Sequence, residues 1–178
     1  MKKITSIAFV LATFIVGCNK PNGFVISGKI TNAEEKYLYL DELKVSSSIP
    51  VDSVKLKKDG SFKFNGKIGY PNFYLLRINE KNFITLLVDT TEKITVYGDA
   101  SNFARDYIVE GSPGSLLVQE LNNRLTVTKH RIDSIRNRVD AFRSLADPVQ
   151  KNKWNSELAE IKRNQIRYST EFVQKHPF

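Results

Sequence analysis

The hydrophobic pattern of this 178-residue chain changes at residues 111–115, and this change limits the fold more than any other feature. Before it, apolar and polar residues alternate in short runs separated by turn signals, which is typical of β-strands. After it, apolar residues recur every three or four positions, which is typical of amphipathic helices. We therefore expect an α+β chain, with a β-domain over residues 24–111 and an antiparallel helical hairpin over residues 112–176.

The β-domain is expected to be an antiparallel β-sandwich or a small open barrel, because short strands follow one another with turn signals between them. Phe24, Ile26 and Ile30 fall on one face of the first strand. Gly28 shares that face, which indicates a bulge or a close backbone approach. Further strands are expected at residues 37–40, 73–78, 83–88, 93–97 and 106–110, with Leu38 and Leu40 facing inward.

The clearest turn signal is Asp59-Gly60, because glycine tolerates the positive φ of a tight turn. Apolar residues alternate with polar ones on both sides of this turn, at Val54, Leu56, Phe62 and Phe64. The alternation predicts a β-hairpin over residues 53–64.

Two caps and two apolar seams define the helical region. Ser112 before Pro113 predicts an N-cap, with Ser115 as the alternative, and Asp147-Pro148 predicts a second cap. The first seam comprises Leu121, Leu125, Thr128, Ile132, Ile135, Val139, Phe142 and Ala146. The second comprises Trp154, Leu158, Ile161, Gln165, Tyr168 and Phe172. Such seams predict a coiled-coil-like pair that packs on itself or on the sheet.

The N-terminus has the pattern of a lipoprotein signal peptide over residues 1–18. Lys2 and Lys3 precede an uncharged stretch, residues 4–16, that is too short to span a bilayer as a permanent helix. The end of the signal peptide resembles a lipobox, in which Ile15, Val16 and Gly17 would be read by the signal peptidase and Cys18 would be lipidated. We expect this lipid to anchor the chain to a membrane, rather than a buried helix with a free thiol.

Cys18 is the only cysteine in the sequence, so the chain after it contains no disulfide, no thiolate metal site and no C-x-x-C pair. Residues 19–23 are expected to form a short tether. Because this tether lacks an acidic cluster, we expect the protein in the cell envelope, on the periplasmic face of the outer membrane.

The side chains after Cys18 include 25 basic and 19 acidic groups, a net charge of +6. Most of the excess lies in residues 115–178, which carry 12 basic and 7 acidic groups. We interpret this excess first as a solvated helix face and second as weak attraction to anionic lipid headgroups. An exported protein rarely meets nucleic acid, so we expect no nucleic-acid partner.

The sequence contains no convincing catalytic constellation and predicts no cofactor and no bound metal. Ser112 lacks the G-x-S-x-G spacing of a hydrolase, and capping explains it. His130 and Asp133 are spaced for a metal or a dyad but are expected to point away from the seam into solvent. Trp154 is expected in the core. No chemistry is expected of Glu157 and Glu160, or of His176 in a disordered C-terminal end.

The order of several short motifs resembles the β-domain called domain of unknown function 4369. These motifs are Gly28-Lys29-Ile30, Tyr-Leu-Tyr-Leu at 37–40, Val-Asp-Ser-Val at 51–54, Asp-Gly-Ser-Phe at 59–62 and Ile-Val-Glu-Gly-Ser at 108–112. The resemblance implies the N-terminal module of lipoproteins whose C-terminal half is a thioredoxin-like thiol–disulfide oxidoreductase of the TlpA/ResA kind. Residues 172–178 resemble the linker into that redox domain, whose C-x-x-C would lie beyond residue 178.

Three functions are therefore open. The first is a membrane-anchored, non-catalytic interaction or spacer module, whose helical hairpin binds an envelope protein or a second copy. The alternative is the N-terminal part of a thioredoxin-like oxidoreductase. The third is a ligand-binding lipoprotein with a shallow site lined by Tyr37, Tyr39, Tyr70 and Tyr74.

Overall fold

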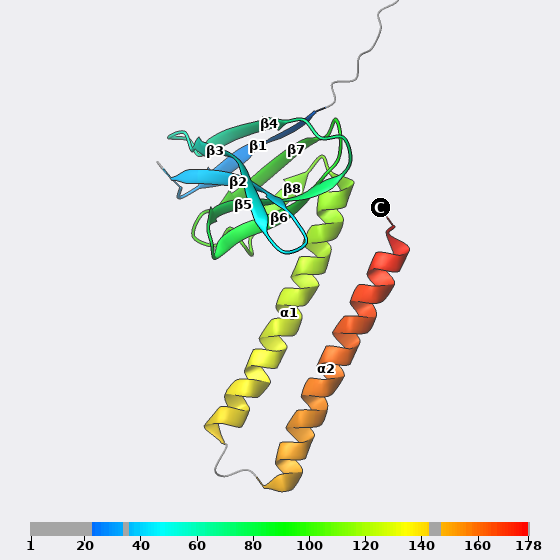
Figure 1. The fold of residues 1–178 in the computed structure, drawn as a ribbon. Helices are drawn as coiled ribbons and strands as arrows, with labels where there is room; N and C mark the ends of the chain where they lie inside the picture. The colour runs from blue at the N-terminus through cyan, green and yellow to red at the C-terminus, as the bar shows by residue number, and fades with distance from the viewer. Residues whose placement is uncertain (1–22, 34–35, 143–146, 178) are drawn as a thin grey trace, which may run out of the picture.

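The computed structural model describes residues 23–33, 36–142 and 147–177, which form two stacked β-sheets and two long helices (Figure 1). The strands are β1 (Phe24–Thr31), β2 (Tyr37–Leu43), β3 (Ser48–Lys55), β4 (Ser61–Gly66), β5 (Asn72–Asn79), β6 (Asn82–Val88), β7 (Lys93–Asp99) and β8 (Tyr107–Glu110). The helices are α1 (Pro113–Ala141) and α2 (Pro148–Lys175). The α+β class is confirmed, and the signal peptide, lipobox and most of the tether lie outside the described residues.

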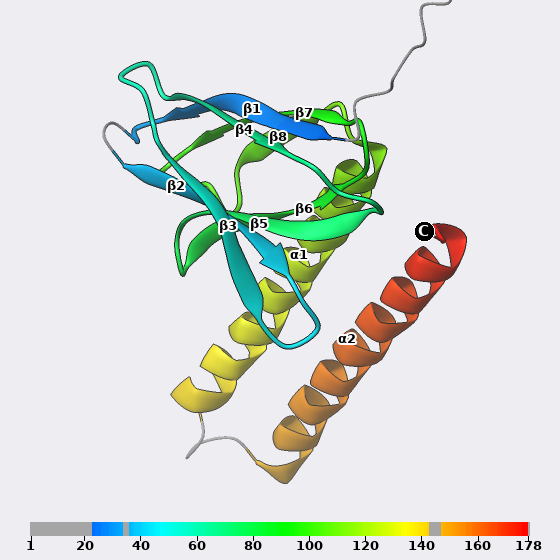
Figure 2. The ribbon, with the colours of Figure 1, turned by 45° about the horizontal axis from the view of Figure 1, so that its top comes forward.

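The two sheets have the strand orders β4-β1-β7-β8 and β3-β2-β5-β6, and Figure 2 shows them as separate layers. The arrangement is a sandwich, not a closed barrel. Alternate residues from both sheets fill the space between the layers, as the sequence predicted for Ile26, Leu38 and Leu40. The largest fully buried side chains of this core include Phe64 and Phe103.

One strand pair departs from the expected antiparallel pattern. β1 and β7 run parallel, with Ile26 beside Ile94, whereas every other strand pair is antiparallel. A parallel pair needs a long crossover connection. Here the chain from β2 to β6 supplies it, because it builds all four strands of the second sheet and also β4 of the first sheet before β7 pairs with β1.

Gly28 permits that parallel pairing. A β-carbon at this position would lie 1.7 Å from the carbonyl oxygen of Val96 on β7. The close backbone approach predicted from the sequence is therefore confirmed.

The predicted hairpin over residues 53–64 is wrong, although its turn forms. The Gly60 amide donates to the carbonyl oxygen of Lys57 at 2.8 Å, and Gly60 has φ +79°. However, β3 pairs with β2 in one sheet, whereas β4 pairs with β1 in the other. A contact between residues far apart in the sequence accounts for this separation of β3 and β4. The Ile30 amide donates to the carbonyl oxygen of Gly60 at 2.9 Å and fixes the turn to the end of β1.

The two helices begin at the predicted caps. The Ser112 side chain accepts a hydrogen bond from the Ser115 amide, and the Asp147 side chain accepts one from the Gln150 amide. Neither helix in the described ranges is apolar enough over a sufficient length to cross a bilayer.

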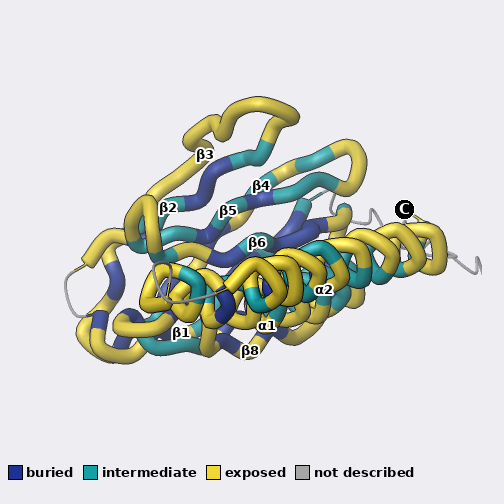
Figure 3. Tube along the Cα trace, turned by 90° about the horizontal axis from the view of Figure 1, so that it is seen from below, coloured by how far each residue is buried: buried dark blue, intermediate teal, exposed yellow. Residues whose placement is uncertain are grey.

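The helices pack on each other through a small apolar cluster in the half of the hairpin farther from the sandwich. Ile135, Trp154 and Ile161 are buried there, with Ile132, Val139 and Leu158 partly buried around them. Most other helical positions are exposed (Figure 3). Phe142, predicted on the seam, is 50% exposed because α1 ends at Ala141 and Phe142 is its C-cap, and Ala146 lies outside the described residues.

Candidate functional site

The start of α1 is fixed to the end of β6 by buried serines. The Ser112 hydroxyl donates to the carbonyl oxygen of Leu87 at 3.0 Å and accepts from the Ser115 amide at 3.2 Å. Ser112 is buried, so its hydroxyl serves the cap and this attachment. Its structural role, predicted from capping, is confirmed.

This attachment creates a cleft between the sandwich and the helices, with a volume of about 300 Å³. The sheet contributes Leu43 and Phe73, α1 contributes Leu117 and Leu121, and the C-terminal end of α2 contributes Phe172 and Val173. The walls are almost entirely apolar. The cleft is therefore an apolar recess and a candidate interaction site.

A row of aromatic side chains runs along α2 to the cleft, where Phe172 and His176 form part of the wall. The Tyr168 and Phe172 rings are 5.8 Å apart, and the Phe172 and His176 rings are 4.8 Å apart. The Tyr168 hydroxyl donates to Glu120 on α1 at 3.0 Å, which ties this end of α2 to α1. The prediction that His176 lies in a disordered end is wrong, because its ring packs on Phe172 and is half-buried.

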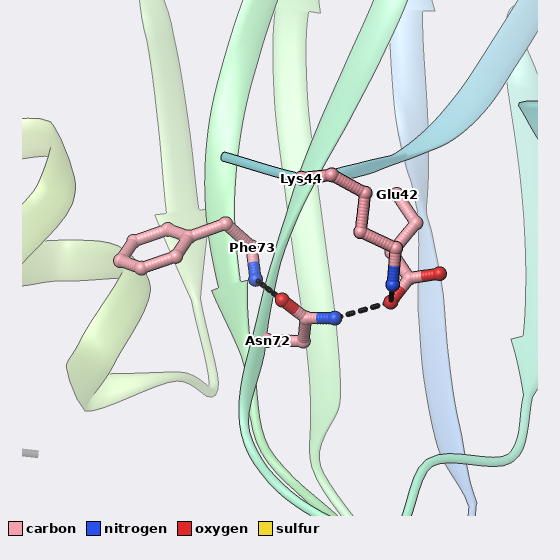
Figure 4. Close-up of polar contacts among 4 residues, drawn as sticks. All are labelled: Glu42, Lys44, Asn72 and Phe73. Atoms are coloured by element: carbon pink, nitrogen blue, oxygen red, sulfur yellow. Dashed lines mark hydrogen bonds and ion pairs between the residues drawn. The ribbon is translucent and has the colours of Figure 1, made fainter. Parts of the chain in front are cut away.

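The sheet wall is held by a polar group beside Phe73 (Figure 4). The Asn72 side chain accepts from the Phe73 amide at 2.9 Å and donates to Glu42, which also pairs with Lys44. Figure 4 shows the Phe73 ring directed away from these polar atoms. The group thus fixes the backbone from which Phe73 reaches the cleft.

The tyrosines proposed as a shallow site do not share one face of the sandwich. Tyr74 lies in the core, where its ring is 5.3 Å from that of Phe24, and burial raises the pKa of its hydroxyl. The guanidinium carbon of Arg77 lies over the Tyr39 ring, 4.4 Å from the ring centroid. Arg77 in turn pairs with the buried Asp41. The contacts of Arg77 therefore give the position of Tyr39 a structural explanation.

The other polar candidates also have definite places. Trp154 packs in the helical cluster, as predicted. Glu157 faces Arg138 at 3.8 Å, which is a surface ion pair. His130 is exposed, as predicted, but Asp133 is half-buried, and both line a second hollow beside α1. Among the described residues, no group of three or more His, Cys, Asp or Glu side chains could hold a metal ion.

The sequence did not reveal the cleft, although one signal points to its sheet wall. Residues 73–76 of β5 are apolar at four consecutive positions, and such a run indicates a strand covered on both faces. One of these faces, with Tyr74 and Leu76, belongs to the sandwich core. Which helix covers the other face depends on tertiary packing.

The protein thus belongs to the class of eight-stranded β-sandwiches that carry a docked pair of helices. Residues 24–118 match the family described as Domain of unknown function (DUF4369), and the chain belongs to this family. The match includes all eight strands and the beginning of α1. No curated protein shows significant similarity to the chain.

Proposed function

We propose that this protein is a lipid-anchored, non-catalytic interaction or spacer module of the cell envelope. The observation that carries the proposal is the apolar cleft, whose three walls come from the sandwich, α1 and α2. The lipobox-like residues 15–18 support the anchor, and the long hairpin gives the module reach.

The partner fits best as a segment of an envelope protein that inserts one or two large apolar side chains. A recess of about 300 Å³ is of this size, and buried apolar anchors dominate the affinity of protein interfaces. Residues 115–178 carry 12 basic and 7 acidic groups, so acidic residues that flank the anchors would favour association.

Site-specific photocrosslinking in cells tests this partner. A crosslinker at Val173, on the cleft wall, should give one discrete adduct, whereas one at Val149, exposed at the far end of α2, should not. The crosslinked protein, once identified and purified, should bind the wild-type chain and lose binding to Leu121→Asp. Equal adducts from both positions, or unchanged binding by the variant, would contradict the proposal.

The anchor has a separate test. Labelled palmitate should enter the wild-type chain and not Cys18→Ala. Equal labelling of the two would overturn the lipid anchor without affecting the cleft.

The linker-like residues 172–178 favour the alternative function, which stays a prediction. In it, the chain is the N-terminal part of a thioredoxin-like thiol–disulfide oxidoreductase. Sequencing the DNA beyond codon 178 tests it, because an in-frame thioredoxin segment would support it and its absence would end it.

A further inference from the structure

The second hollow lies beside α1 and has a volume of about 520 Å³. Five segments meet there: the β5–β6 turn with Lys81, β6, the loop before β8 with Arg105, β8 itself with Tyr107, and α1 with Lys129. Thr85 and Asn122 line both this hollow and the apolar cleft, so the two recesses flank the crossing of α1 over β6. The volume is in the range of small-molecule sites.

Positive charge dominates the walls of this hollow. Lys81, Arg105 and Lys129 come from three different segments, with His130 next to Lys129. Among the described residues that line the hollow, Asp133 is the one carboxylate, and it already faces Arg136 at 3.8 Å. Within the described part of the chain, no carboxylate forms an ion pair with any of these three cations.

Tyr107 on β8 supplies a buried polar group in the same wall. Its side chain is 9% exposed, and its hydroxyl has no hydrogen-bond partner among the described residues. Burial raises the pKa of this hydroxyl, and the nearby Asn122 amide, which does not reach hydrogen-bond geometry, offsets that effect only in part. The hydroxyl is therefore a protonated donor, and a buried donor without an acceptor is costly unless a ligand supplies one.

Apolar side chains complete the recess. Phe83 on β6 and Leu125 on α1 both line it and are 39% and 43% exposed, although each is large and hydrophobic. A hydrated inorganic ion would leave this apolar surface in water. An organic anion would cover it.

We propose that this hollow binds a small organic anion, such as a phosphate or carboxylate attached to an apolar ring or chain. Lys81, Arg105 and Lys129 would hold the charged group. The Tyr107 hydroxyl would donate to an acceptor on the ligand, and its apolar part would lie between Phe83 and Leu125. This inference is independent of the lipid anchor and of the partner proposed for the cleft.

NMR titration of the chain from residue 19 onward tests the proposal, with phenyl phosphate and phenylacetate as probes. At least one probe should shift the Arg105, Tyr107 and Asn122 amides in a saturable manner. Benzyl alcohol, a neutral analogue, should bind at least about tenfold more weakly, because it makes no charge-assisted hydrogen bond. If neither anion binds, or if the neutral analogue binds equally well, the proposal is wrong.

Variants separate a built site from general attraction to a basic surface. Arg105→Gln and Lys129→Gln should each weaken binding roughly tenfold. Arg131→Gln is the matched control, because Arg131 is exposed on α1 and does not line the hollow. An equal loss in this control would show nonspecific attraction and overturn the proposal.

Tyr107→Phe distinguishes a ligand-binding role of the Tyr107 hydroxyl from a purely structural one. Removing a hydroxyl without a partner should leave the melting temperature of the free chain unchanged or raise it, yet weaken probe binding several-fold. Lower stability with unchanged binding would contradict the assigned role.

Vesicles containing phosphatidylglycerol then distinguish two sources of the same chemistry. Competition between vesicles and phenyl phosphate would assign the anion to a lipid headgroup. Binding of the probe without such competition would assign it to a soluble compound.

Discussion

The side chain of Ser115 and the backbone of Leu87 form two hydrogen bonds. The Ser115 hydroxyl donates to the Leu87 carbonyl oxygen at 2.9 Å and accepts from the Leu87 amide at 3.1 Å. Both residues are buried. The hydroxyl therefore joins the first turn of α1 to the end of β6, and this junction determines where α1 crosses the sheet and where the two recesses form.

Ser115→Ala should lower the free energy of unfolding by about 2 kcal/mol, because the buried Leu87 amide loses its acceptor. Urea unfolding followed by circular dichroism measures this change. Ser134→Ala, at an exposed position of the same helix, is the control and should stay within about 0.5 kcal/mol of wild type. If the two variants unfold alike, the junction contributes no stability.

Gly28→Ala should destabilise the sandwich by about 3 kcal/mol or more, because the added methyl group collides with the backbone of β7. Hydrogen exchange should become faster along β1 and β7. Gly69→Ala is a matched control, since a β-carbon there meets no atom within 4 Å. Its stability should stay within about 1 kcal/mol of wild type. A mild effect at Gly28 would mean that β1 and β7 are not paired so closely.

Features that depend on neighbouring residues could be predicted from the sequence. The period-two alternation identified the inward faces of β1 and β2, and the Ser-Pro and Asp-Pro pairs identified the starts of both helices. These predictions succeeded because a strand face or a cap is determined within a few residues.

Pairing partners and recesses could not be predicted in this way. Asp59-Gly60 forms the expected turn, but a hairpin and a connection between two sheets can share such a turn. The hydrogen bond between Ile30 and Gly60, which distinguishes them, joins residues 30 positions apart. The second hollow likewise combines Lys81, Arg105 and Lys129, whose proximity depends on how α1 crosses β6.

Ile135→Ala should loosen the helical hairpin without unfolding the sandwich. Ile135 belongs to the small cluster around Trp154, separate from the sandwich core, and truncating a buried isoleucine costs about 2 to 5 kcal/mol. Trp154 is the only tryptophan, so its fluorescence reports on the hairpin alone. The fluorescence midpoint in urea should fall, whereas the midpoint of the β-sheet circular dichroism signal should change little.

Ile166→Ala is the control for that experiment, because Ile166 is 67% exposed on α2. It should leave both midpoints close to those of the wild type. A parallel fall of both signals in Ile135→Ala would instead show that hairpin and sandwich unfold as one unit.

Asp99 predicts how stability depends on acid. Its carboxylate accepts from the Ser101 hydroxyl, from the Ser101 amide at 2.8 Å and from the Thr31 hydroxyl at 3.0 Å, and these hydrogen bonds lower its pKa from 3.8 to about 2. A pKa that is lower in the folded state stabilises the fold above pH 3.8, and this contribution is lost as the pH falls towards 2.

The melting temperature of the wild-type chain should therefore fall between pH 4 and pH 2 more steeply than that of Asp99→Asn, which has no carboxylate to protonate. Ser101→Ala should show an intermediate slope, since it removes the hydroxyl donor and keeps the amide donor. Thermal scans across this pH range provide the measurement. If wild type and Asp99→Asn show the same slope, the hydrogen bonds around Asp99 do not favour its charged form.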